Sequence, residues 1–243
     1  MNDDERELAL NCYGYGRWDA PYWFIGPEQG KGKLERKDLT DRARANRKLN
    51  RDGLCDCRAF HIEIQDETWH LKKDGSRSQH SPPLQSTWKS LILLLMAYKK
   101  MPTTDESRID YQREYQRKCL GSSTGETCVI ELSGLPAKNF EESWERERGR
   151  SAEEREAIDE IRQKRIEFIH NKMLTCKPKF IVVYGKSQMK YWIKFWKDKG
   201  VDASHSGNVV KLGSTTIVFT LHPVRSPGNQ YWIDLGAKLR AVI

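Results

Sequence analysis

The sequence predicts an α/β fold, namely a single three-layer α/β/α domain with a central, mainly parallel sheet. Short apolar runs recur along the chain at residues 22–25, 128–132, 180–184 and 214–221. Segments with helical character separate these runs, and an alternation of strands and helices is typical of a parallel sheet covered on both faces. The 243 residues contain no internal repeat and no low-complexity linker, so we expect one domain over residues 1–243.

The first strand, residues 22–25, is rich in aromatic and β-branched side chains and ends at Gly26 and Pro27. A glycine-rich loop follows it. Residues 31–59 form a basic insert that we interpret either as an exposed helix or as a mobile segment. Residues 60–64 (FHIEI) are predicted to form a further strand.

A proline pair separates this region from the first buried helix. Pro82 and Pro83 do not fit a helix interior, and Ser86 is expected to cap a helix over residues 87–99. That helix is apolar nearly all round, which predicts burial in the core. Further helices are predicted over three stretches: 140–173, 188–199 and 232–242.

Composition limits the class of protein. The formal net charge is +8, the mean hydropathy is −0.77, and the longest apolar run, residues 91–98, is too short to cross a bilayer. The acidic N-terminus shows no signal peptide, so we expect a cytoplasmic protein without a membrane partner. The six cysteines are sparse and contain no C-x-x-C pair, so no metal and no cofactor are expected. The basic excess favours a polyanionic partner.

Unusual residues follow the four most apolar strands. They are Gly26-Pro27-Glu28, Glu131 with Ser133-Gly134, Gly185-Lys186-Ser187, and His222-Pro223. In parallel sheets, ligands bind outside the carboxyl ends of the strands. Four such ends predict one shared site at this edge of the sheet.

Four segments in chain order carry a resemblance to a known family. They are residues 24–30 (FIGPEQG), 81–86 (SPPLQS), 177–185 (KPKFIVVYG) and 218–224 (VFTLHPV). In this order they are similar to the motifs of the uracil-DNA glycosylase superfamily: a strand with a tight glycine–proline loop, a proline-rich loop, a K-P-K strand ending in glycine, and a strand followed by H-P-S. The resemblance covers about residues 20–243 apart from the insert, and it implies a monofunctional DNA glycosylase that leaves an abasic site.

The resemblance assigns the catalytic pair. Glu28 stands where family members carry the carboxylate or amide that orients water, so we expect it to act as a general base or to stabilise the sugar cation. His222 matches the histidine that donates to the oxygen of the departing base. The chain departs from the family at Pro27, where some branches have a catalytic polar residue, and it lacks the iron–sulfur cysteines of other branches.

Base recognition is assigned to Glu131, Phe60 and Gln29, the last of which replaces the usual proline. The family usually carries asparagine at the position of Glu131. An ionised carboxylate only accepts hydrogen bonds, so it suits the exocyclic amine of a cytosine and repels the O4 atom of uracil. The alternative is that Glu131 faces helices or pairs with a basic residue. Phe60 is the expected stacking partner of a flipped base.

Contacts to DNA are assigned around the same edge. Lys186 and Ser187 open a helix whose N-terminus attracts phosphate, and Arg225 with Ser226 matches the family's minor-groove wedge, a surface turn being the alternative for the wedge. Pro82, Pro83 and Ser86 occupy the place of the DNA-compressing loop. The expected partner is double-stranded DNA with a modified base, bound by a monomer.

The predicted substrate is a modified cytosine, such as glucosylated hydroxymethylcytosine, in defence against phage; the defence role follows from the resemblance. One alternative is a glycosylase that repairs uracil in DNA. A second is a non-catalytic module that binds modified DNA on the same fold. A third is an enzyme that binds nucleotides or hydrolyses free nucleosides.

Overall fold

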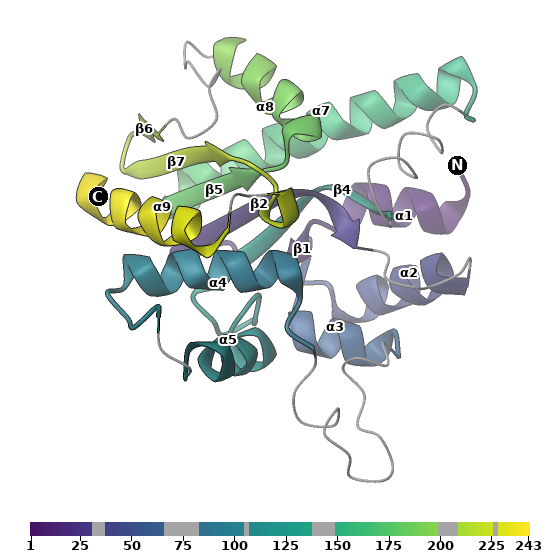
Figure 1. Ribbon diagram of the computed structural model, residues 1–243. Coiled ribbons are helices and arrows are strands. Elements are labelled where there is room, and N and C mark those ends of the chain that lie inside the picture. The colour runs from purple at the N-terminus through teal and green to yellow at the C-terminus, as the bar shows by residue number, and fades with distance from the viewer. Residues whose placement is uncertain (31–36, 66–82, 105–106, 138–148, 199–208, 226–227) are drawn as a thin grey trace, which may run out of the picture.

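The computed structural model describes residues 1–30, 37–65, 83–104, 107–137, 149–198, 209–225 and 228–243 (Figure 1). In these ranges seven strands form one sheet in the order β3-β1-β4-β2-β5-β7-β6. The strands are β1 (Gly14–Tyr15), β2 (Tyr22–Gly30), β3 (Leu54–Cys55), β4 (Thr127–Ala137), β5 (Phe180–Tyr184), β6 (Val209–Leu212) and β7 (Thr215–Thr220).

The centre of the sheet is parallel. Strand β2 pairs in parallel with β4 on one side and with β5 on the other, and β5 pairs in parallel with β7. Strands β1 and β6 run antiparallel to their inner neighbours β4 and β7. The predicted α/β class with a mainly parallel sheet is therefore confirmed.

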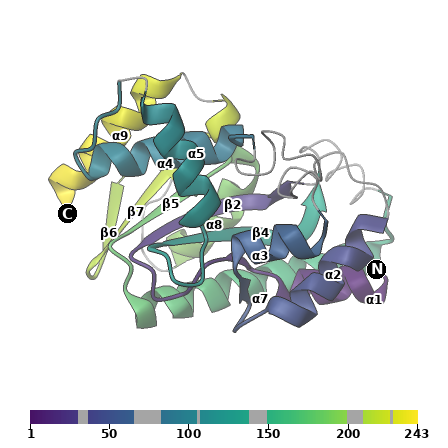
Figure 2. The same ribbon diagram turned by 90° about the horizontal axis from the view of Figure 1, so that it is seen from below.

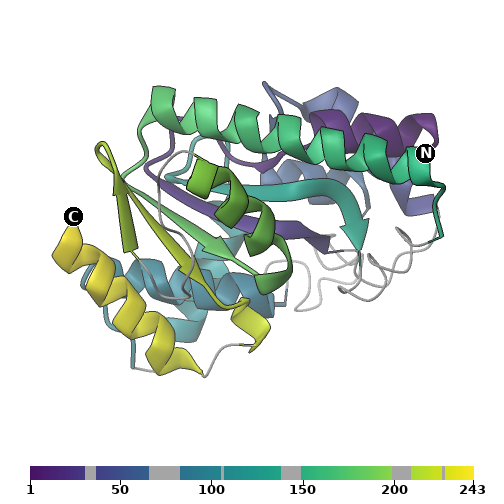
Figure 3. The same ribbon diagram turned by 90° about the horizontal axis from the view of Figure 1, so that it is seen from above.

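Helices cover both faces of the sheet. Figures 1 and 2 show α4, α5 and α9 on one face, and Figures 1 and 3 show α7 and α8 on the other. The helices are α1 (Asp3–Asn11), α2 (Lys37–Leu49), α3 (Cys57–Glu63), α4 (Ser86–Tyr98), α5 (Ser107–Lys118), α7 (Ala152–Cys176), α8 (Lys186–Asp198) and α9 (Asn229–Val242), with a 3₁₀ turn, η2 (Pro223–Arg225). Successive strand residues point to opposite faces, so Phe24 and Val182 join the core under α4 and α9, whereas Ile25 and Val183 join the core under α7 and α8.

The predicted strand over residues 60–64 is wrong, because this segment belongs to helix α3 and the turn after it. The Asp56 side chain caps the helix by accepting a hydrogen bond from the backbone N–H of Ala59 at 3.0 Å. Phe60 and Ile64 are buried while Ile62 is 41% exposed, which is the pattern of helical i, i+4 spacing and not of one strand face. The alternating apolar residues of this segment therefore do not form a strand, because the Asp56 cap begins a helix.

Helix α4 confirms the buried helix after the prolines, but its cap differs from the prediction. Ser86 is the first helical residue, and the Gln85 side chain accepts the hydrogen bond from the backbone N–H of Trp88 at 2.9 Å. Pro82 and the segment before it lie outside the described residues. In the basic insert, α2 is a helix with a buried face, since Arg42, Ala43 and Asn46 are buried.

Strands β2 and β4 run further than predicted. Beyond Ile25, strand β2 pairs only with β4, because β5 ends at Tyr184. Glu28 pairs with Ser133 and Gly30 with Ala137 across this extension. Pro27 lacks an N–H donor, and it is tolerated here because one side of β2 no longer has a neighbouring strand in the described sheet.

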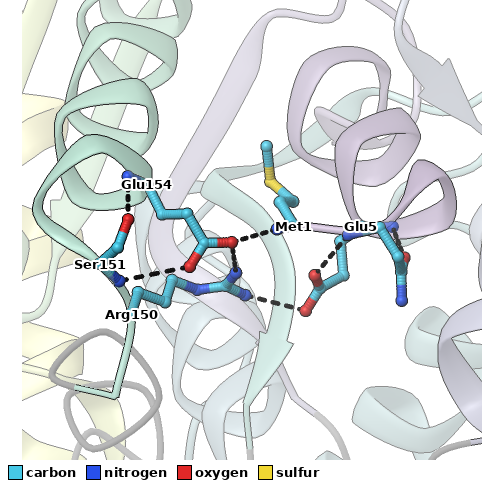
Figure 4. Close-up of polar contacts among 6 residues, drawn as sticks. Met1, Glu5, Arg150, Ser151 and Glu154 are labelled. Atoms are coloured by element: carbon cyan, nitrogen blue, oxygen red, sulfur yellow. Dashed lines mark hydrogen bonds and ion pairs between the residues drawn. The ribbon is translucent and has the colours of Figure 1, made fainter.

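Helices α1 and α7 are joined at their N-termini. Both begin with a capping box, formed by Asn2 with Glu5 and by Ser151 with Glu154. Arg150 lies between them, with its guanidinium 2.8 Å from the Glu5 carboxylate and 3.6 Å from that of Glu154 (Figure 4). The backbone nitrogen of Met1 also lies against Glu154 (Figure 4). These contacts fix the entry of α7 beside α1.

A buried arginine holds the same two helices to the sheet. Arg165 of α7 is 2% exposed and donates to the carbonyl oxygens of Leu132, Ala9, Cys12 and Glu131 at 2.7–2.9 Å. Its guanidinium also lies 4.1 Å from the centre of the Tyr13 ring. One side chain thus joins α1, the turn after it, β4 and α7.

No helix in the described part of the chain is long and apolar enough to span a bilayer.

Replacing Arg165 with methionine should destabilise the fold strongly. The change leaves four carbonyl oxygens without their charged donor, and we expect a loss of about 3 kcal/mol or more in the free energy of unfolding. Urea denaturation measures this loss, with Lys164→Met, an exposed position on the same helix, as the matched control. An Arg165→Met midpoint equal to that of the control would show that the guanidinium contributes nothing.

Candidate functional site

The order of the parallel strands indicates where a ligand-binding site would lie, namely at the carboxyl ends of β2 and β5. Strand β2 leads over the α4 face to β4, whereas β4 leads over the α7 face to β5, on the other side of β2. Strand β5 in turn leads into α8 on the α7 face, so the connections after β2 and β5 depart toward opposite faces of the sheet. Ligands of open α/β sheets bind at such a switch point, outside the carboxyl ends of the two strands.

Gly185 brings three elements together at this point. It follows β5 with a φ of 100°, a backbone conformation that favours glycine. A Cβ atom there would lie 3.3 Å from the ring of Pro27, just beyond the part of β2 that pairs with β5, and 3.8 Å from Cδ2 of His222, after β7. Pro27 and His222 thus lie against the same residue, so the predicted convergence of these strand ends is present in the fold.

Glu131 lies one strand further along the edge. It pairs with Gly26 across β4 and β2, and its side chain is 6% exposed. A Cβ atom at Gly26 would stand 2.4 Å from the hydroxyl oxygen of Tyr184 and 2.8 Å from Oε2 of Glu131. The carboxylate and the phenol are therefore close neighbours above the bare backbone of Gly26, on the face covered by α4.

The backbone of Glu131 is held on both sides. Its N–H donates to the carbonyl oxygen of Tyr13 at 2.8 Å, and its own carbonyl accepts from Arg165 at 2.7 Å. The charges of Glu131 and Arg165 attract each other, which partly offsets the lowering of the Arg165 pKa by burial. The Glu131 side chain lies on the sheet face covered by α4, whereas the hydrogen bond from Arg165 goes to its backbone carbonyl.

His222 is oriented by a short turn. The backbone N–H of Arg225 donates to the carbonyl of His222 at 2.8 Å, and the N–H of Val224 donates to Nδ1 at 3.3 Å. Because Nδ1 accepts, the neutral ring carries its proton on Nε2. The Tyr184 ring meets the imidazole edge-on, with 5.6 Å between centroids.

The imidazole of His222 and the phenol of Tyr184 both stay neutral at physiological pH. Burial lowers the pKa of His222 below its ordinary value, and the positive charge of Arg225 lowers it further. Burial raises the pKa of the Tyr184 phenol well above its ordinary value, and the charge of Glu131 adds to this. The edge therefore presents an imidazole N–H, a phenol O–H and a carboxylate.

The structure describes the positions of only some of the other predicted site residues. Glu28 and Gln29 belong to β2, and Lys186 and Ser187 open α8, but their side chains lie outside the described part of the structure. Ser226, like Pro82, falls outside the described residues altogether. Arg225, Pro83 and Ser86 are exposed. Figure 1 shows η2, which contains Arg225, beside the start of α4, and the two elements are in contact.

The burial of Phe60 contradicts its predicted role as the stacking partner of a flipped base. Its ring is fully buried and packs edge-on against Tyr15 at a centroid distance of 5.4 Å. A ring with no exposed face is not accessible to a nucleobase in this structure. Phe60 instead anchors α3 to the core beside β1.

Sequence reasoning missed Tyr184 and Gln116. Tyr184 belongs to a run that the sequence predicts as a buried strand, although its place directly before Gly185 at the strand end is a usable signal of a site residue. Gln116 of α5 is buried, donates to the carbonyl of Pro83 at 3.1 Å and accepts from the N–H of Gln85 at 2.9 Å. It thereby holds the segment that leads into α4, and no local pattern indicates this long-range contact.

A cavity of about 490 Å³ lies elsewhere, between α1, the end of α2 and α7. None of the predicted site residues lines it. Within the described residues, no three His, Cys, Asp or Glu side chains are grouped to hold a metal ion. All six cysteines lie in the described part of the chain, and none of them forms a disulfide.

Comparison with known proteins adds no relative. No family model matches the chain, and the curated proteins include no match to it. The function must therefore be argued from the geometry above and from the motifs in the sequence.

Removing the charge of Arg225 should raise the pKa of His222. Arg225→Gln removes a positive charge that disfavours the imidazolium, so the ring should take up its proton at a higher pH than in the unmodified protein. NMR titration of the His222 ring, assigned with a His222→Asn variant, measures the shift. Arg44→Gln on α2 is the control and should leave the titration unchanged; an unchanged titration in Arg225→Gln would contradict the proposed electrostatic coupling.

The same shift has a consequence for stability. Because the folded protein binds this proton less readily than the unfolded chain, His222 disfavours the folded state as the pH falls through the ordinary histidine pKa of about 6.5. Arg225→Gln should reduce this loss of stability in acid.

Proposed function

We propose that this protein is a DNA glycosylase that flips a modified base, preferably a modified cytosine, out of double-stranded DNA and hydrolyses its N-glycosidic bond. The observation that carries the proposal is the convergence of Pro27, Glu131, Gly185 and His222 at the switch point of the sheet. The four motifs that resemble the uracil-DNA glycosylase superfamily supply the reaction class. The net charge of +8 suits a polyanionic substrate.

The chemistry follows from charge development. As the bond between the base nitrogen and C1′ breaks, negative charge builds on the base and positive charge on the sugar. His222 is neutral with its proton on Nε2, so it can donate a hydrogen bond to the base oxygen without first being protonated to imidazolium. Glu28 is assigned to the water that adds to C1′ and to the sugar cation. The base and an abasic site are the products.

Glu131 is assigned to the far edge of the base. Its carboxylate accepts hydrogen bonds and offers none while ionised, so it favours an exocyclic N–H group over a carbonyl oxygen. Its position on the edge shared with His222 supports recognition of cytosine-type bases. The defence role against phage DNA with glucosylated hydroxymethylcytosine, and a cytoplasmic location, belong to the same proposal and depend on the resemblance.

Excision assays test the proposal directly. Duplexes carrying cytosine, hydroxymethylcytosine, glucosylated hydroxymethylcytosine or uracil are incubated with the protein and cleaved with alkali, and the released base is identified by mass spectrometry. We expect a modified cytosine to be excised fastest. Glu28→Gln and His222→Ala should each lower the rate by about 100-fold or more while DNA binding changes little. Glu153→Gln, at an exposed position on α7, is the matched control.

The variant Glu131→Gln tests the assigned preference for cytosine-type bases over uracil. The new amide can donate to O4, so the ratio of uracil to cytosine-type excision should rise by about 10-fold or more. Faster excision of uracil than of every cytosine derivative by the unmodified protein would overturn the cytosine assignment and favour a uracil repair enzyme. Tight binding of modified duplex without release of any base would instead favour a non-catalytic binding module.

A further inference from the structure

Tyr184 occupies the centre of the candidate site, although no motif assigns it a role. It is the last residue of β5, its side chain is 3% exposed, and it lies on the sheet face covered by α4. Strand β5 stands between β2 and β7, so Tyr184 is placed between the strand that pairs with Glu131 and the strand that precedes His222.

The ring of Tyr184 restrains His222. The two rings meet at an interplanar angle of 73° with 5.6 Å between centroids, an edge-to-face arrangement. The N–H of Val224 holds Nδ1 from another direction. Together these contacts determine where the Nε2–H bond of His222 points.

The hydroxyl of Tyr184 lies beside Glu131. Both groups reach the space above Gly26, where a Cβ atom would stand 2.4 Å from the hydroxyl oxygen and 2.8 Å from Oε2 of Glu131. Only a residue without a side chain leaves this space to the two groups. Burial and the negative charge of Glu131 both raise the pKa of the phenol, so the hydroxyl beside the carboxylate keeps its proton.

We propose that Tyr184 is a positioning residue that sets the placement of the His222 imidazole relative to the Glu131 carboxylate, through its ring on one side and its hydroxyl on the other. It acts through these two groups and is not assigned a contact with the reacting atoms. Its effect on base choice rests on the proposed glycosylase function. Its effect on the placement of His222 does not depend on that function, and it can be measured in the protein without DNA.

Two substitutions separate the parts of the side chain. Tyr184→Phe keeps the ring and removes the hydroxyl, so we expect an unchanged His222 titration together with weaker discrimination between modified cytosine and uracil. Tyr184→Leu removes the ring, so His222 should become more exposed, titrate at a higher pH and lose about 10-fold or more in excision rate. Tyr111→Phe on α5 is the control and should change none of these quantities.

The space above Gly26 provides a further test. Gly26→Ala places a methyl group against the Tyr184 ring and hydroxyl, so it should lower the urea midpoint. In the Tyr184→Leu background the same change should cost less, because the Tyr184 atoms that the methyl group meets have been removed and, of its three nearest atoms, only Oε2 of Glu131 remains. Equal losses in the two backgrounds would contradict the geometry.

The outcomes distinguish the two proposals. If Tyr184→Leu folds and leaves both the His222 titration and the base preference unchanged, the positioning role is overturned. If Tyr184→Leu does not fold, the base preference of Tyr184→Phe decides, and an unchanged preference overturns the role of the hydroxyl. If the unmodified protein excises no base, the glycosylase proposal fails, while the NMR titration and the Gly26→Ala pair still decide whether Tyr184 positions His222.

Discussion

The buried guanidinium of Arg165 is the interaction on which the arrangement of this fold depends most. A cation removed from water must satisfy its donors inside the protein, and the planar guanidinium does so here with backbone carbonyls of α1, the turn after α1, and β4. Helix α7, which supplies Arg165, follows β4 in the chain and covers the opposite sheet face from α4. The need of Arg165 for hydrogen-bond acceptors therefore sets the spacing of α1, β4 and α7.

The same constraint reaches the candidate site through β4. Two of the four carbonyls belong to Glu131 and Leu132, so the backbone that carries the Glu131 side chain is held by Arg165 on one side and by the strand pairing with β2 on the other. Gly134 continues this close packing, since a Cβ atom there would meet the carbonyl oxygen of Leu8 at 2.0 Å. The carboxylate is thus mounted on a rigid support, as a group that discriminates between ligands needs to be.

Around this support, chemistry is concentrated where the strands end. His222 and Tyr184 are neutral hydrogen-bond donors at physiological pH, and Glu131 is an acceptor while ionised; Gly26 and Gly185 allow the three to approach. Each glycine matters because it omits a Cβ atom, at Gly185 together with a positive φ. The cavity of about 490 Å³ beside α1 contributes none of these groups.

The sequence by itself determined the α/β class, the central strands β2, β4, β5 and β7, and the edge where Glu131, Gly185 and His222 gather, because apolar runs buried on both faces and the residues after them are local features. It misplaced residues 60–64, where a cap at Asp56 decided for a helix, and it did not reveal the short strands β1 and β3, whose pairing involves distant partners. Only the tertiary structure decided that Phe60 is buried in the core, that Arg165 joins α1 to β4, and that Tyr184 lies between Glu131 and His222. These are contacts between residues far apart in the chain, and spacing along a sequence carries no information about which side chains meet once helices and sheet have packed.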